Sequence, residues 1–331
     1  MDKWLIARDR LEVQLRGKYN NEIINDITEL VDKFIGYSEQ FLNYWREVGN
    51  EVRKLIDDLM NGRAEVIIRP NGISVYYKYI ALDTHETSTG GVTVQLVLNG
   101  LEGVTIKVPD VFRKTMSRKE YRKFIKKMLK ALRGGFEESD GSVNKGKALM
   151  RTTRIWQVIA WALLYPGEVY ALICEININE GSVTITWHLK SDHDSLKGKI
   201  LGNAEELGEE ELLAFMLGAV LGDGYADVAK VVAKGHVYDE AAIVITMSDE
   251  EFKMWLPLLE RLKNMGFRSA KPRTKEGNAV DVPFYGSNAI DLARAMINVL
   301  PPILRDVLDA LGFEKWLKLR RITEMEVKWR R

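Results

Sequence analysis

Apolar residues recur along the C-terminal third of the chain with two alternating periods, which predicts an ordered series of helices and strands. Apolar and β-branched runs typical of strands lie at residues 225–233, 242–247, 269–274 and 280–285. Between the second and third runs, a 3.6-residue period indicates a helix that begins after the N-cap Ser248 and ends at Gly266. A last helix is expected over residues 289–299, before Pro301. With a helix before residue 225, the predicted order is helix, two strands, helix, two strands, helix.

A compressed version of the same order lies in the middle of the chain. The expected strands are residues 142–145, 148–152, 169–178 and 182–190. A helix over residues 154–165 separates the two strand pairs and is closed by Pro166. The second pair would form a hairpin about residues 179–181. The chain therefore contains two copies of one structural pattern.

The first 112 residues form a separate segment. A long helical period runs over residues 21–61, and strands are expected at 64–70, 73–82, 92–98 and 104–108. This segment carries no catalytic constellation. It is either an additional nucleic-acid contact surface or a dimerisation module, and the sequence does not choose between them. The predicted domains are residues 1–112, 113–200 and 201–331.

The helix that opens each copy carries two small residues four positions apart and ends in Asp-Gly. These residues are Gly135, Ser139 and Asp140 in the first copy, and Gly218, Gly222 and Asp223 in the second. Small residues at i and i+4 share a helix face and let two helices pack almost backbone to backbone. Gly141 and Gly224 are expected to end the helices with a positive φ. Although one Asp-Gly is an ordinary helix stop, two packed helices would pair their carboxylates, which suits divalent metals and phosphodiester chemistry.

These two motifs and the elements that follow them resemble the LAGLIDADG homing endonuclease family, whose single-chain members carry two such motifs. GFEESDGS (135–142) looks like a common variant, and GAVLGDGY (218–225) looks like the form frequent in archaeal proteins. The resemblance covers residues 117–300. It implies an α+β fold of two pseudo-symmetric αββαββα units with saddle-shaped antiparallel sheets, here with an N-terminal α+β extension. The Trp-rich first copy also resembles a multicopy crenarchaeal repeat-protein family.

The resemblance implies that Asp140 and Asp223 bind Mg²⁺ together with the scissile phosphates and water. The family also places a basic residue near the metals. Lys190 is the candidate in the first copy, and His188 is a weaker one. The equivalent stretch of the second copy, residues 284–287, contains no lysine. Half of the expected site therefore departs from the family's pattern.

One face of the hairpin at residues 173–190 is apolar, and the other carries side chains that could read base edges in the major groove. The candidates for DNA contact there are Asn177, Asn179, Thr184, Thr186 and His188. In the second copy, Lys271, Arg273 and Lys275 alternate along one strand. The family uses a curved sheet from each copy in this way. The alternative for both sheets is an ordinary solvated face.

Basic residues gather in two places. Residues 113–133 contain ten basic residues against one acid, and Arg118, Arg122 and Lys126 would form a ridge on one helix. This ridge is either a phosphate-contacting surface or a solvated face. Residues 311–331 are basic again, and are interpreted as an arm on DNA or as a frayed tail.

Composition restricts the class of protein. Hydrophobic content of 46% and charged content of 29% are those of a globular protein, and the longest apolar runs are far too short to cross a bilayer. The chain opens without a basic and then apolar leader, and its single cysteine, Cys174, cannot form an intramolecular disulfide. These features predict a cytoplasmic protein with no membrane partner.

Two functions compete. The first is a monomeric, Mg²⁺-dependent endonuclease of an archaeal mobile element that cleaves double-stranded DNA at a specific sequence. The second is a non-cleaving DNA-binding protein, or an RNA maturase that binds structured RNA, built on the same fold. Both aspartates are present, which favours the enzyme. The missing lysine in the second copy and a net charge of only +1 favour the alternative.

Overall fold

A computed structural model describes residues 2–70, 72–77, 80–86, 92–98, 101–179, 182–233, 235–275 and 279–326. The chain folds as two compact units, each assembled from separate segments. Unit 1 comprises Met1–Asp9, Asn25–Pro109 and Met150–Asp192, and unit 2 comprises Arg10–Ile24, Asp110–Leu149 and His193–Arg331. This division differs from three consecutive segments, because the N-terminal strands share a unit with the central hairpin, and both motif helices share the other.

Unit 1 is an antiparallel sheet covered by helices. Its strands are β1 (Val66–Arg69), β2 (Gly72–Tyr77), β3 (Ile80–Glu86), β4 (Val92–Leu98), β5 (Val104–Val108), β8 (Gly167–Asn179) and most of β9 (Ser182–Asp194). They follow the order β1-β2-β3-β4-β8-β9, and β5 pairs with the other end of β8. The expected single strand at 73–82 is wrong, because Tyr77 pairs with Ile80 and the chain reverses between them. The residues of that reversal, and of the β8–β9 turn at 180–181, lie outside the described part of the chain.

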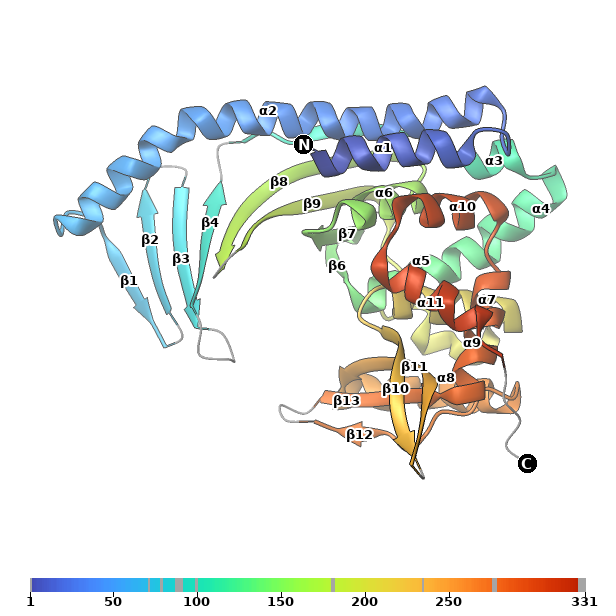
Figure 1. Cartoon of the computed structure of the whole chain (residues 1–331). Helices are drawn as coiled ribbons and strands as arrows, with labels where there is room; N and C mark the ends of the chain where they lie inside the picture. Colours follow the sequence, from blue (N-terminus) through green and yellow to red (C-terminus); the bar gives the residue numbers. More distant parts are fainter. Residues whose placement is uncertain are drawn as a thin grey trace. The chain divides into compact units, whose positions relative to one another are not determined.

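The core of unit 1 lies between this sheet and α2 (Asn21–Met60), which runs along it (Figure 1). The ring of Trp187 on β9 packs against those of Phe34 and Tyr37 on α2, each at 5.8 Å between centroids. Trp4 of α1 (Asp2–Leu15) packs against Trp187 at 5.4 Å. Aromatic side chains bury the largest apolar areas, so this cluster anchors the helices on one face of the sheet. The 3.6-residue apolar period of α2 makes this packing continuous.

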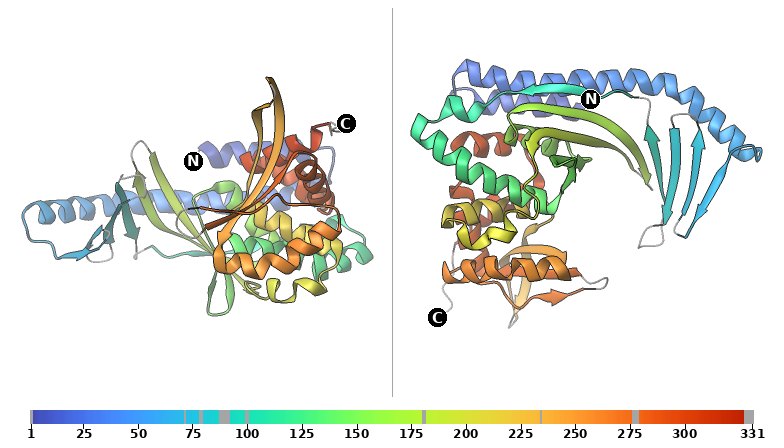
Figure 2. Two further views of the ribbon diagram at one scale, coloured as in Figure 1. Left: turned by 90° about the horizontal axis from the view of Figure 1, so that it is seen from below. Right: turned by 180° about the vertical axis from the view of Figure 1, so that it is seen from behind.

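Unit 2 contains both motif helices and a four-stranded sheet. Its helices are α3 (Val111–Thr115), α4 (Arg118–Lys123), η1 (Phe124–Leu129), α5 (Lys130–Ser139), η2 (Leu201–Glu206), α7 (Glu209–Leu221), α8 (Asp249–Asn264), α9 (Gly286–Asn298), α10 (Pro302–Leu311) and α11 (Glu314–Glu324). Its strands include β6 (Gly141–Asn144), β10 (Tyr225–Ala233), β11 (His236–Ser248), β12 (Arg273–Thr274) and β13 (Ala279–Tyr285). The antiparallel order β10-β11-β13-β12 places α7, α8 and α9 against the sheet (Figure 2). The strand β7 (Lys147–Thr152), which crosses the boundary between the units, and α6 (Ile155–Leu164), which belongs to unit 1, follow β6 in the chain.

Two expectations for unit 2 are corrected by the structure. The strand expected at 269–274 is reduced to the two residues of β12, because Pro272 has no N–H to donate to a ladder. Arg118, Arg122 and Lys126 do not lie on one regular α-helix, because Arg118 and Arg122 are on α4 and Lys126 is in the π-helical turn η1. A π turn changes the angular spacing of side chains, so Lys126 leaves the ridge that Arg118 and Arg122 would define.

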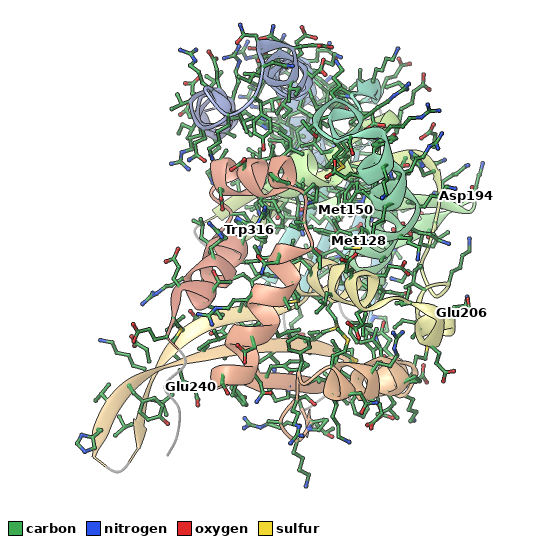
Figure 3. All side chains as sticks on the ribbon, turned by 90° about the vertical axis from the view of Figure 1, so that its right-hand side faces the viewer. Met128, Met150, Asp194, Glu206, Glu240 and Trp316 are labelled. Atoms are coloured by element: carbon green, nitrogen blue, oxygen red, sulfur yellow. The ribbon has the colours of Figure 1, made fainter. Side chains whose placement is uncertain are left out.

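The C-terminal stretch is folded rather than frayed as far as Glu324. The helix α10 ends at Gly312, whose φ of 62° is the left-handed conformation that favours glycine. The next helix, α11, buries Trp316, Leu319 and Ile322. Trp316 donates its Nε1–H to Asp309 Oδ1 at 2.6 Å, and is labelled in Figure 3. The last basic residues, 328–331, lie outside the described residues.

The α+β class with antiparallel sheets is confirmed. Within the described residues, no helix is both long enough and apolar enough to cross a membrane.

Candidate functional site

The motif helices α5 and α7 pack backbone against backbone. A Cβ added to Gly135 would lie 2.0 Å from the carbonyl oxygen of Phe215, and one added to Gly218 would lie 2.3 Å from that of Leu132. Further along, a Cβ on Gly222 would lie 1.8 Å from Ser139 Oγ. Carbon and oxygen atoms that are not bonded do not approach this closely, so only glycine fits at these positions. The structure thus brings together all four small residues of the two motifs.

Both motif helices end with the same local geometry, although not the one expected. Gly141 and Gly224 are absent from the glycines with positive φ, so the predicted left-handed stop is wrong. Each glycine instead turns back onto its own helix. A Cβ added to Gly141 would lie 2.4 Å from the Cα of Glu137, and one added to Gly224 would lie 2.5 Å from the Cα of Val220. Glycine is required here by close approach to the residue four positions earlier, and not by the sign of φ.

This geometry places the two aspartates at the same end of the helix seam. The backbone nitrogen of Asp140 lies 3.4 Å from the position of a Cβ on Gly222, the residue before Asp223. Asp140 is half-buried and Asp223 is exposed. The ends of the motifs therefore meet, with one carboxylate partly sheltered and the other open to solvent.

A small pocket, partly open to solvent, lies beside Asp223. Its lining includes Glu138 and Ser139 at the end of α5, Thr246 on β11 and Glu251 on α8, together with Lys197. Asp140 does not line this pocket. The sequence analysis missed Thr246, Glu251 and Lys197, because each comes from a different part of the chain and only folding brings them to Asp223. Glu138 could have been noticed in the sequence, because Glu137 and Glu138 form a pair of acidic residues within the first motif.

The acid pair Glu137-Glu138 holds the loop that carries Lys197. Glu137 is fully buried, and its Oε2 accepts hydrogen bonds from the Ser195 hydroxyl at 2.6 Å and the Leu196 N–H at 2.7 Å. Glu138 accepts one from the Gly198 N–H. Burial raises the pKa of Glu138, and the nearby Lys197 opposes that rise. Lys197 Nζ in turn donates to the carbonyl oxygen of Gly141 at 2.7 Å, one residue after Asp140.

The second motif also has a lysine at its end. Lys315 on α11 donates its Nζ protons to the carbonyl oxygens of Gly222 and Leu221, the latter at 3.3 Å. A cation at these last carbonyls of α7 is favourable, because they carry the negative end of the helix dipole. The stretch 284–287, where the repeat predicts a basic residue for this half, contains no lysine, and Lys315 instead comes from a helix beyond the repeat. Lys190 lies on β9 in unit 1, half-buried, and its role stays a prediction.

The donor set at the seam is made of carboxylates, which are the side chains that Mg²⁺ prefers. Asp140 and Asp223 could hold such an ion, with water and phosphate oxygens filling the other positions, as is usual for this metal. Within the ranges that the structure describes, no group of three or more His, Cys, Asp or Glu side chains is placed to hold a metal by itself. A metal held by Asp140 and Asp223 would need water or substrate oxygens for its remaining coordination positions.

The candidate DNA-reading residues of unit 1 share one face of the β8–β9 hairpin. Asn177 is directly opposite Thr184, and Glu175 is opposite Thr186. Thr186 is buried and accepts a hydrogen bond from Asn177 Nδ2 at 2.9 Å, so it supports its neighbour rather than presenting itself to a partner. His188 is half-buried, and burial lowers its pKa. The side chain of Asn179 lies outside the described part of the chain.

The candidate basic residues of unit 2 lie on its surface. Lys271, Arg273 and Lys275 are all exposed, and Lys275 also forms an ion pair of 2.7 Å with Asp281. Arg118, Arg122 and Lys126 are all exposed. Their neighbours Lys123 and Lys127 pair with the first-turn acids Glu210 and Glu211 of α7, at 2.5 and 3.0 Å. Two lysines of the basic stretch 113–133 are therefore paired with acidic residues of the protein itself.

Comparison with known proteins gives only remote likenesses. No protein-family model matches the chain, and no curated protein matches it. Among solved structures, full-length DUF199/WhiA from Thermatoga maritima aligns with a TM-score of 0.28 and 12% identity over 59% of this chain, spanning 59% of its own length. The homing endonuclease I-WcaI, bound to its DNA recognition sequence, aligns with a TM-score of 0.30 and 12% identity over 57% of this chain and 90% of its own. At these scores the likenesses carry no weight for function, which must be inferred from the site.

Proposed function

We propose that this protein is a metal-dependent endonuclease of the LAGLIDADG type that cleaves both strands of a DNA duplex. The observation that supports the proposal is the backbone-to-backbone seam of α5 and α7, whose ends bring the backbone of Asp140 close to Gly222, the residue before Asp223. Two carboxylates at one point suit the hydrolysis of two phosphodiesters that face each other across a duplex groove. One chain supplies both carboxylates, so a monomer is sufficient.

Four residues at the end of the seam have proposed roles in this chemistry. Asp140 and Asp223 would hold Mg²⁺, which supplies Lewis acidity and a nucleophilic water when bound. Lys197 and Lys315 each hold an ammonium group within hydrogen-bonding distance of a carbonyl beside a motif aspartate. Ammonium groups here offset the negative charge of phosphates brought to the carboxylates, and would stabilise the charge that develops during cleavage. We propose them for the role of the basic residue near the metals, for which Lys190, and less strongly His188, were the candidates from the sequence.

The alternative is a DNA-binding protein, or an RNA maturase, that keeps the fold without cleaving. Two observations favour it: the described residues contain no cluster of three metal-binding side chains, and the net charge is only +1. The seam itself does not distinguish the two functions, because its packing is needed for either.

The test is incubation of the purified protein with a randomised duplex library, with Mg²⁺ or with EDTA, followed by sequencing of bound and cleaved DNA. Mg²⁺-dependent ends at one long motif are expected for the wild type. Asp140→Asn and Asp223→Asn should abolish cleavage and retain binding, whereas Asp57→Asn, which removes the same charge from an exposed position on α2, should change neither.

Bound but uncut DNA would replace the endonuclease with the non-cleaving alternative. Cleavage that survives both aspartate substitutions would show that the seam end is not the active site.

A further inference from the structure

A row of hydrogen-bonding side chains crosses five strands of unit 1. Successive directly opposed residues in the antiparallel ladder are Ser74, Asp83, Gln95, Asn177 and Thr184, on β2, β3, β4, β8 and β9. Directly opposed residues point to the same face of a sheet, so all five share one face. Ser74 is buried and the other four are half-buried. The polar face of the central hairpin therefore continues into the N-terminal segment.

The adjacent row points to the opposite face and is entirely apolar. It consists of Val75, Leu82, Leu96, Ile176 and Ile185. Trp187 lies on this second face and packs under α2, as described above. The sheet is therefore amphipathic across its whole width, with α2 on its apolar side (Figure 2).

Cationic and aromatic groups flank the polar row on its own face. At the outer edge, Arg69 Nη2 donates to Tyr76 Oη at 2.9 Å, and both side chains are exposed. His85 and Thr93 are directly opposed on β3 and β4, one step along the same face. Arg151 forms an ion pair of 3.3 Å with Glu175, which neutralises the acid on β8. Arginine, histidine, tyrosine and amide groups together are typical of surfaces that contact both bases and phosphates.

We propose that strands β1–β4 extend the DNA-contacting face of β8 and β9, so that the N-terminal segment lengthens the recognised sequence on one side. Gln95 and Thr93 would contact base edges beside those contacted by Asn177 and Thr184, and Arg69 would contact a phosphate. Four added strands widen a sheet by about 19 Å, which corresponds to roughly six base pairs of duplex. The proposal rests on the proposed DNA binding, and resolves the open choice between a nucleic-acid surface and a dimerisation module.

Dimerisation is the competing use of this segment. The edge strand β1 exposes Ile68 to 81%, and an exposed apolar edge can pair with another copy. The polar face argues against it as the main use, because the centres of protein interfaces are depleted of charged side chains and enriched in apolar ones.

The test compares hydroxyl-radical footprints on a duplex recovered from the randomised library. Arg69→Ala and Gln95→Ala should each weaken binding roughly fivefold to a hundredfold and remove protection from one outer end of the footprint only. Arg69→Ala should also lower the slope of log affinity against log salt by about one, and Gln95→Ala should relax sequence preference at the outer positions. The matched control is Arg53→Ala, which removes an exposed arginine from α2, on the other side of the sheet, and should alter nothing.

The outcomes distinguish failure of this inference from failure of the proposed DNA binding. A wild-type footprint that both variants leave unchanged would overturn the extended reading face and leave the endonuclease intact. Absence of any wild-type footprint would instead overturn the proposed DNA binding, and this inference with it. If the wild type is a dimer by light scattering and Ile68→Asp makes it a monomer without changing the footprint, the segment is a dimerisation module and the inference is wrong.

Discussion

Replacement of Gly218 by alanine tests the seam on which the proposed site depends. The new Cβ would lie 2.3 Å from the carbonyl oxygen of Leu132 and 2.8 Å from the nitrogen of Phe136. Both atoms belong to the backbone of α5, so no side chain can rotate away, and the two helices must separate by roughly 1 Å to reach ordinary contact distance.

The magnitude follows from two opposing effects. Overpacking of this kind costs about 1–3 kcal/mol or more, while alanine gains about 1 kcal/mol over glycine in a helix interior. Because both clashes are with backbone atoms, the cost is expected at the upper end of this range, and the net loss in the free energy of unfolding is roughly 2 kcal/mol. Displacement of a catalytic group by about 1 Å can also lower cleavage about a hundredfold, so cleavage should fall more steeply than stability.

The matched control is Gly49→Ala on α2, where no atom lies within 4 Å of the added Cβ. It has the same helix propensity gain without a clash, and should stabilise the protein by about 0.5–1 kcal/mol. Urea unfolding followed by circular dichroism measures both variants, and single-turnover cleavage measures the effect on the site. A Gly218→Ala protein as stable as the wild type would refute the backbone-to-backbone packing of α5 and α7.

Three further predictions concern single side chains. Lys197→Met should lower single-turnover cleavage about a hundredfold with little change in binding, whereas Lys197→Arg should retain part of the rate. Full activity of the Met variant would exclude a role for this ammonium group. Because burial lowers the pKa of His188, the folded protein binds fewer protons there than the unfolded chain does. The free energy of unfolding should therefore decline as pH falls through about 6.5. In urea titrations between about pH 5 and 8, His188→Gln should flatten this dependence. An unchanged pH dependence in that variant would assign it to other groups. Trp316→Ala should cost about 3–5 kcal/mol of unfolding free energy, since the side chain is fully buried, and a loss below about 1 kcal/mol would mean that α11 is not part of the core.

The local pattern of the sequence was sufficient for most elements of the fold. The period of apolar residues located α2, α8 and the hairpin β8–β9, because helices and half-buried strands impose different spacings on residues that must face a core. The period of apolar residues did not predict the structure at points where that period is interrupted. The reversal between Tyr77 and Ile80 has no apolar signature, and the π-helical turn η1 arises from packing that an average helical period does not reveal.

The sequence by itself determined which residues could line a close helix seam and where its carboxylates would lie. Glycine at positions 135, 218 and 222 is a local property that permits close approach, and Asp140 and Asp223 are fixed by their position after it. Gly141 and Gly224 are also required for a local reason, but that reason is close contact with the residue four positions earlier and not the positive φ that the Asp-Gly motif suggested.

Only the tertiary structure decided which other groups meet at this point. Lys197 and Lys315 reach the motif ends from a loop and from a C-terminal helix, and Gln95 joins Asn177 through a strand pairing between segments about eighty residues apart. Periodicity specifies which face of an element is buried, but not which element it meets. Which elements pack together depends on long-range contacts of the whole chain. Those contacts underlie both the proposed site and the proposed extension of the DNA-contacting face.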